Sequence, residues 1–307
     1  MTLADYATFS QYAVASATVV LSLAFLAFVA ELGFVRREAR VLVGSDGEPL
    51  EPEAAEAPET RSDLLQRVGV ALTAVAAAVL TVGVVTRGLA AERVPWGNMY
   101  EFGAAGVAIA LVTFLILSVT SQVQWLGGVV AGFGLLVLGL SWTAYVPAGP
   151  LVPALHSYWL VIHVAAVMLA GGLFLLGAAA SVLYIVKERA EQRGTVGPIL
   201  RRLPVIGAMD RLAYRVHAVG FVLWTFGALI AGPIWAQYAW GRYWGWDPKE
   251  VWAFITWVVY ACYLHARATA GWRGRRAALL ALAGFATFLF SYYGVNIFVP
   301  GLHSYAK

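Results

Sequence analysis

Runs of about 20 apolar residues recur along the chain, and they restrict its fold more than any other feature of the sequence. A run of this length suits a helix that crosses the hydrocarbon core of a bilayer. With 61% hydrophobic and only 12% charged residues, the chain is too apolar for an ordinary soluble domain. We therefore predict an all-α integral membrane protein, a polytopic bundle of about eight transmembrane helices, with residues 1–307 as a single transmembrane domain. The predicted spans are 12–35, 67–86, 99–119, 125–146, 157–186, 213–236, 250–266 and 277–297.

The basic residues predict how these helices are oriented. Of the 21 lysines and arginines, 15 fall in three segments on one side of the predicted membrane, namely 36–67, 187–211 and 267–276. The positive-inside rule makes that side cytoplasmic, so both termini are expected outside. A net charge of +4 could suggest binding to nucleic acid. Because the basic residues lie beside the apolar spans, the positive-inside rule explains them, and we expect no nucleic-acid partner. Residues 36–66 contain a polar, acidic stretch poor in apolar side chains, which predicts a flexible cytoplasmic linker.

The loop at residues 237–250, called the tryptophan loop below, lies between the sixth and seventh predicted spans and is therefore expected outside. Trp240, Trp244 and Trp246 fall within seven residues and are separated by glycines. This spacing does not match one face of a helix, and no metal or phosphate site requires it. We predict that the three rings build a flat aromatic surface.

Helix-start signals follow two of the outer loops. Asp247, Pro248 and Glu250 have the order of an N-cap, a first helical residue and a capping-box partner. Asp247 could instead act as a catalytic acid or base. We favour the cap, because capping the helix explains an aspartate at this position without any catalytic role. In the earlier loop, Asn98 and Glu101 have the same spacing of cap and capping-box partner. For that loop two interpretations stay open, a capped helix within an interfacial aromatic belt or a wall of a ligand site.

The five histidines of the chain form two levels. His156 and His163 are seven residues apart, which would place them two helical turns apart on one face at the outer side. His303 follows the last span on the same side, whereas His217 and His265 lie near the inner ends of the sixth and seventh spans. An ionisable side chain within a membrane span costs free energy and usually faces a cavity. A lone histidine, however, is often only a packing residue.

Outer histidines beside an aromatic loop are compatible with three interpretations. One is haem, whose iron binds two imidazoles and whose apolar ring stacks on indoles, with Arg242 or Lys249 paired to a propionate. Another is an interfacial aromatic belt with unrelated histidines. The third is a site for a quinone or another flat ligand.

The tryptophan loop and its surroundings resemble a known family. The segment 240–250 resembles the tryptophan-rich WWD motif of the haem-handling CcsA proteins, also called ResC or CcsB, of System II cytochrome c biogenesis. The resemblance extends over nearly all of 205–307 and to two upstream segments. Its further matching stretches are 98–101, 153–164, 257, 263–267, 271–272, 293–296 and 301–305.

The resemblance implies a haem-handling component of a haem lyase, or cytochrome c synthase, in the bacterial cytoplasmic (inner) membrane. Haem b would be presented outside and joined to the cysteines of a Cys-x-x-Cys-His apocytochrome c. The implied partners are a CcsB/ResB-type membrane protein, apocytochrome c and thiol-reducing pathway proteins. His163 and His303 match the outer iron ligands, and His265 matches a transmembrane histidine on the haem's route. For His217, at a similar depth, two interpretations stay open: it substitutes for the partner's ligand, or it is a packing residue hydrogen-bonded to a backbone carbonyl, which we favour. The implied haem-binding loop residues are Trp240, Gly241, Arg242, Trp244, Trp246 and Asp247.

No residue is assigned as a catalytic acid or base, because orientation, a dry setting and control of the iron's redox state are what such a site contributes. Two other functional classes stay open. The two histidine levels would also suit a cytochrome b-like redox subunit, and an aromatic exit would suit an exporter of a flat amphipathic solute.

Overall fold

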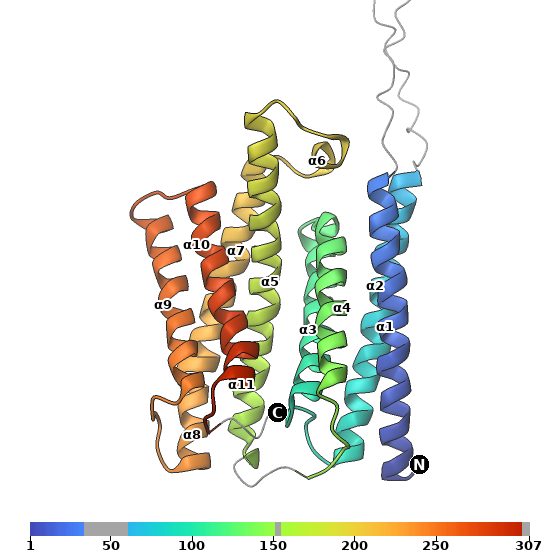
Figure 1. Cartoon of the computed structure of the whole chain (residues 1–307), viewed down its shortest axis with the longest axis vertical. Helices are drawn as coiled ribbons and strands as arrows, with labels where there is room; N and C mark the ends of the chain where they lie inside the picture. The colour runs from blue at the N-terminus through green and yellow to red at the C-terminus, as the bar shows by residue number, and fades with distance from the viewer. Residues whose placement is uncertain (34–60, 151–154, 303–307) are drawn as a thin grey trace, which may run out of the picture.

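The structure, a computed structural model, describes residues 1–33, 61–150 and 155–302, and within these ranges the chain is a bundle of helices without strands (Figure 1). His303 and most of the predicted linker lie outside the described residues. The prediction of an all-α polytopic bundle is confirmed. The long helices are α1 (Leu3–Gly33), α2 (Arg61–Ala91), α3 (Met99–Thr120), α4 (Gly127–Thr143), α5 (Tyr158–Gln192), α7 (Ile206–Trp224), α9 (Pro248–Ala268) and α10 (Arg275–Leu289).

Shorter elements complete or join these helices. The 3-10 turn η1 (Gln124–Leu126) precedes α4, and α6 (Pro198–Arg202) lies in the connection after α5. The π-helical segment η3 (Thr225–Ala231) links α7 to α8 (Gly232–Trp240), and a second one, η4 (Phe290–Gly294), links α10 to α11 (Val295–Phe298).

Seven helical segments of the described chain are long and apolar enough to cross a membrane. The predicted span 250–266 is α9, which is not among these seven although it is 21 residues long and packs beside α10. Aromatic and polar side chains, among them Trp252, Tyr260 and His265, lower its apolar character. In Figure 1, α9 nevertheless runs alongside the other helices from one end of the bundle to the other.

The helices alternate in direction, which sorts the connections between the two ends of the bundle. The tryptophan loop lies at the same end as the N-terminus and the loop between α2 and α3 (Figure 1). The connection from α5 to α7 and the turn from α9 to α10 lie at the opposite end. The structure describes two of the three basic segments in full, 187–211 and 267–276, and both lie at this opposite end. The orientation of the bundle across a membrane stays a prediction.

Small residues bring the helices close together. Between α1 and α2, a Cβ added to Gly83 would lie 3.1 Å from a methyl carbon of Val14, and the buried hydroxyl of Ser10 donates to the Gly83 carbonyl at 2.7 Å. Such contacts replace the hydrophobic driving force that helices lack in lipid. Helices α1–α4 form one group and α5–α10 the other (Figure 1). The candidate site lies between residues of both groups.

Residues of both π-helical segments, Ala228 and Tyr292 among them, line the same cavity as Trp240 and Trp244. A π-helical turn widens a helix, and such turns are frequent at functional sites. After η3, Pro233 lacks the backbone N–H that would continue a regular ladder. The Gly232 N–H then donates to the Gly227 carbonyl five residues back. The same Gly227 carbonyl oxygen lies 2.8 Å from Nδ1 of His163.

Candidate functional site

The tryptophan loop is held in shape by a carboxylate and by two left-handed residues. Gly241 ends α8 with φ of 72°, and Trp246 has φ of 56°, a conformation that is strained for a residue with a side chain. Glu250 Oε2 accepts hydrogen bonds from the backbone N–H groups of Gly245 at 2.8 Å and Asp247 at 3.1 Å. Asp247 caps α9 in turn, so the predicted capping box is confirmed.

The three indoles of the loop do not form one flat surface, which corrects the sequence-based expectation. Trp240 and Trp244 line a cavity, but 67% of Trp246 is exposed and this residue does not line it. The Trp246 ring stands at 88° to that of Trp244. The backbone at Trp246 is left-handed, with φ of 56°, and its ring packs edge to face on Trp244 and Phe254 instead of lying in one plane with the other indoles.

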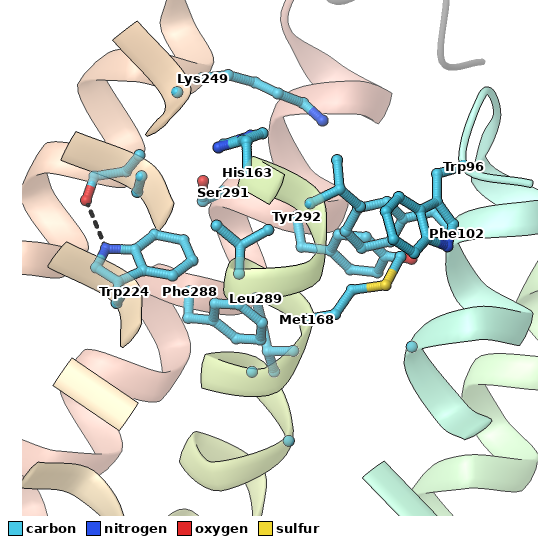
Figure 2. Close-up of a pocket in the computed structure, with 18 of the residues that line it drawn as sticks. Trp96, Phe102, His163, Met168, Trp224, Lys249, Phe288, Leu289, Ser291 and Tyr292 are labelled. Atoms are coloured by element: carbon cyan, nitrogen blue, oxygen red, sulfur yellow. Dashed lines mark hydrogen bonds between the residues drawn. The ribbon is translucent and has the colours of Figure 1, made fainter. Parts of the chain in front are cut away.

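The cavity has a volume of about 230 Å³ and runs from the tryptophan loop into the bundle. Figure 2 shows Lys249 and His163 towards one end of it and Phe288 with Leu289 towards the other. Its walls are mostly apolar, and glycines such as Gly106 of α3 and Gly172 of α5 leave room between the two helix groups. A flat, largely apolar ligand with polar groups at one edge matches this lining.

His163 of α5 is the histidine that lines this cavity among the described residues. Its Nδ1 lies 2.8 Å from the Gly227 carbonyl oxygen of η3. A carbonyl can only accept, so a neutral imidazole here carries its proton on Nδ1 and its lone pair on Nε2. The ring also stacks on Trp235 of α8, with centroids 5.9 Å apart and planes at 12°. Metal-binding histidines in proteins are oriented by this kind of bond, and Nε2 of His163 is suited to bind an iron atom.

His156 is not on the same helix face as His163, contrary to the sequence-based expectation. It precedes Ser157, which is the N-cap of α5, so the helical periodicity does not extend to it. Its exposed side chain lines a separate groove beside Arg93 and Tyr238. Ser157 takes the cap position, and the chain turns before the histidine can join the helix.

The inner histidines lie in different surroundings and do not meet. His217 of α7 is fully buried, and a Cβ added to Gly177 would lie within 2.5–2.8 Å of three of its ring atoms. Phe174, Tyr260 and Tyr263 surround the same imidazole, which supports packing, but its two nitrogens make no hydrogen bond of standard geometry to the described residues, so the expected bond to a backbone carbonyl is not found. His265 is exposed on the surface of α9. Neither residue lines the cavity.

Two basic side chains were candidates to pair with an acidic ligand group, and they differ in position. The guanidinium of Arg242 lies on the backbone of the loop, because a Cβ added to Gly245 would be 2.3 Å from its Cζ. Lys249 lines the cavity and extends across it near His163 (Figure 2). Lys249 is therefore better placed for a ligand inside the cavity.

The loop before α3 is fixed by a buried charge network. Asn98 caps α3 as predicted, accepting from the Glu101 N–H at 2.9 Å. Glu101 does not bond back to the cap residue, which corrects the capping-box expectation. Its carboxylate accepts from Arg87 at 2.9 Å, from Arg93 at 2.6 Å and from the Gly97 N–H at 2.9 Å. The two arginines draw the carboxylate away from the cap because a buried charge must be paired.

Some residues of the site were not singled out from the sequence. Trp235 stacks on His163 and meets Trp240 edge to face at 4.8 Å, and Trp96 of the loop before α3 lines the cavity. Trp96 was within the loop for which a ligand-lining interpretation stayed open. Trp235 lies five residues before Trp240, at a spacing that gave no signal by itself.

Fold and site together define a class: a polytopic helical membrane protein with an aromatic cavity that contains a histidine and opens towards one end of the bundle. The chain matches the family model for the cytochrome C assembly protein over residues 74–303. It is 36% identical over 258 residues to the cytochrome c biogenesis protein CcsA of Guillardia theta, covering 78% of this chain and 85% of that protein. It is 33% identical over 298 residues to CcsA of Gloeobacter violaceus, covering 80% and 88%. The chain therefore belongs to the CcsA family of cytochrome c assembly proteins, as the resemblance of its motifs predicts.

A solved structure is also similar in fold. The cytochrome c heme lyase CcmF matches with a TM-score of 0.63 at 17% sequence identity, over 95% of this chain and 47% of the CcmF chain. The chain thus spans about half the length of CcmF. At this identity the likeness shows a shared helical architecture.

Proposed function

We propose that this protein presents haem b outside the bacterial cytoplasmic membrane for attachment to apocytochrome c, as the haem-handling subunit of a cytochrome c synthase. The observation that carries the proposal is the oriented imidazole of His163 in an apolar cavity beneath the tryptophan loop. Membership of a cytochrome c assembly family supports it.

The described residues have distinct roles in this proposal. His163 binds the iron through Nε2, and the Gly227 carbonyl keeps the ring in that orientation. Trp240 and Trp244 pack against the porphyrin at the loop end of the cavity. Lys249 pairs with a propionate there. Trp246 and Arg242 lie on the outer side of the loop, and their inclusion in the haem-binding set rests on the family resemblance.

The remaining ligands and partners follow from the family. His303 supplies the second axial ligand, and the exposed His265 at the opposite end belongs to a site shared with a CcsB/ResB-type partner. Thiol-reducing pathway proteins keep the acceptor cysteines reduced. With the basic segments in the cytoplasm, both termini and the tryptophan loop are outside, where apocytochrome c meets the haem.

Haem is the substrate of this reaction, and its vinyl groups supply the reactive carbons. Each thiol adds across one vinyl C=C, so that sulfur bonds to one carbon and the thiol hydrogen goes to the other. The protein's contribution is to hold the ring, to exclude water and to leave the vinyl edge accessible. Asp247 is engaged by backbone N–H groups and is not needed as an acid.

The test compares three histidine variants of the full chain, expressed with its CcsB/ResB-type partner. His163→Ala and His303→Ala are expected to lose the bis-histidine absorption spectrum and the yield of holocytochrome c. His156→Ala, which changes a histidine at the same end but outside the cavity, is the matched control and is expected to retain both. Equal losses at His156 and His163 would refute the assignment.

A second measurement separates the rival classes. Addition of a Cys-x-x-Cys-His peptide to the haem-loaded wild-type complex is expected to shift the reduced α-band towards the thioether-linked form. An unchanged b-type spectrum together with rapid reduction by quinol would support a redox subunit instead. Absence of haem from the complex would favour export of another flat solute.

A further inference from the structure

Two indole N–H groups join the start of η3 to α9. Trp224, the last residue of α7, donates through Nε1 to the Ala253 carbonyl of α9 at 3.1 Å (Figure 2). In the other direction, Trp257 of α9 donates through Nε1 to the Thr225 hydroxyl of η3 at 3.0 Å. An indole N–H can only donate, so each bond has one possible direction. These two bonds are called the indole clamp below.

The Thr225 hydroxyl lies where the helix changes its hydrogen-bond register. It accepts from Trp257 and donates to the Phe221 carbonyl at 2.7 Å. The Thr225 N–H also donates to Phe221, four residues back, as in an α-helix. At the end of η3, the Gly232 N–H donates instead to Gly227, five residues back. The change from the α to the π register therefore begins at the indole clamp.

The π register determines which carbonyl meets His163. The Gly227 oxygen lies 2.8 Å from Nδ1 of this histidine. Gly227 also packs tightly on α5, since an added Cβ would lie 2.9 Å from Ala166 Cβ. The segment η3 is thus in contact with α5 on one side and bonded to α9 on the other. Because π-helical turns are rare and α-helical turns are ordinarily favoured, contacts outside the helix must stabilise the π register here.

Trp257 lies outside the cavity lining that the described residues form, so it does not touch a ligand there. We propose that Trp257 is a positioning residue for His163. By holding Thr225 it fixes the π register of η3, and this register places the Gly227 carbonyl against Nδ1 of the imidazole. The consequence for haem binding rests on the proposed function, whereas the orientation of the imidazole does not.

The first measurement needs no haem and reads where the imidazole carries its proton. The full chain, isotopically labelled in its histidine nitrogens, is studied by NMR in detergent at a pH where the ring is neutral, and His163→Gln assigns the signals. In the wild type, the Gly227 carbonyl keeps the proton on Nδ1. Trp257→Phe retains an aromatic ring but has no N–H donor. The ratio of the Nδ1–H to the Nε2–H tautomer should fall about two- to tenfold, the range expected for one hydrogen bond.

Changes at Thr225 separate the hydrogen bond from the packing of the indole. Thr225→Val keeps the shape of the side chain but has no hydroxyl, and it should lower the tautomer ratio as Trp257→Phe does. Thr225→Ser keeps the hydroxyl and should retain the wild-type ratio. The double variant of Trp257→Phe and Thr225→Val should lower the ratio little further than either change alone, because both remove the same bond.

Trp252→Phe is the matched control for the indole. Trp252 belongs to the same helix, packs on Phe290 of η4 with ring centroids 4.1 Å apart, and lies outside the lining of the cavity among the described residues. This variant should keep the wild-type tautomer ratio. An unchanged ratio in both Trp257→Phe and Thr225→Val would overturn the positioning role, and so would an equal fall in Trp252→Phe.

The second measurement tests whether this orientation matters for haem. Haem is titrated into the haem-free complex with the CcsB/ResB-type partner. Trp257→Phe should weaken haem binding about tenfold, as changes to the partners of metal-binding histidines do, whereas Thr225→Ser and Trp252→Phe should bind as the wild type does. A lower tautomer ratio with wild-type haem affinity would overturn the link from Trp257 to the haem site. A wild-type complex that binds no haem would instead refute the proposed function, and the tautomer ratio would still decide whether Trp257 positions His163.

Discussion

The carbonyl of Gly227 provides a sensitive test of how His163 is held. In Gly227→Ala, the new Cβ would lie 2.9 Å from Ala166 Cβ, 3.0 Å from Val167 Cγ1 and 3.1 Å from the Val167 backbone nitrogen. None of these atoms is the end of a flexible side chain, so η3 and α5 must separate by a few tenths of an ångström. The carbonyl then moves relative to His163 Nδ1, to which it is now bonded at 2.8 Å.

The expected effect is on haem affinity. Changes to the hydrogen-bond partners of metal-binding histidines weaken metal binding about 10–100-fold. That corresponds to about 1.4–2.8 kcal/mol of binding free energy. The assay is titration of haem into the haem-free complex, with the dissociation constant and the spin state read from the absorption spectrum.

The control for this experiment is Gly139→Ala. Gly139 lies on the exposed face of α4, outside the cavity, and its added Cβ meets nothing within 4 Å. Haem affinity equal to wild type in both variants would refute the idea that the Gly227 carbonyl orients the ligand. An equal loss in both would show a general effect of alanine in these helices.

Three further predictions follow from other parts of the structure. Glu101→Ala leaves a buried arginine without its counter-ion and should destabilise the protein by about 3–5 kcal/mol, seen as a lower melting temperature in detergent; an unchanged melting temperature would contradict this. In His217→Leu, the amount of haem that co-purifies with the complex should stay within about twofold of wild type, because this ring packs in the core. In His265→Ala, the amount should fall. The reverse result would place the inner site on α7. Topology reporters after Lys307 and in the tryptophan loop should report the exterior, and one within 36–66 the cytoplasm; a cytoplasmic result after Lys307 would remove His303 from the site.

The sequence alone determined the properties that depend on neighbouring residues. The apolar runs predicted the helical membrane class, since each run must satisfy its own backbone hydrogen bonds in lipid. The caps at Asn98 and Asp247 were predictable because a cap and its helix are a few residues apart. The tryptophan-rich motif predicted the family for the same reason, as a contiguous segment.

The features that the sequence did not determine involve residues far apart in the chain. The stacking of Trp235 on His163 and the bond from Asp247 to Leu302 each join segments separated by more than 50 residues. Glu101 shows how a tertiary contact can compete with a local one. Its spacing from Asn98 favoured a capping box, in which its side chain would accept from the backbone N–H of the cap. Arg87 and Arg93, although only 14 and 8 residues earlier in the chain, offered the buried carboxylate a stronger partner than the backbone N–H of the cap, and the folding of α2 against α3 brought them there. Tertiary contacts decide such cases because the free energy of pairing a buried charge exceeds that of a local hydrogen bond, and only the packed helices show which charges become buried together.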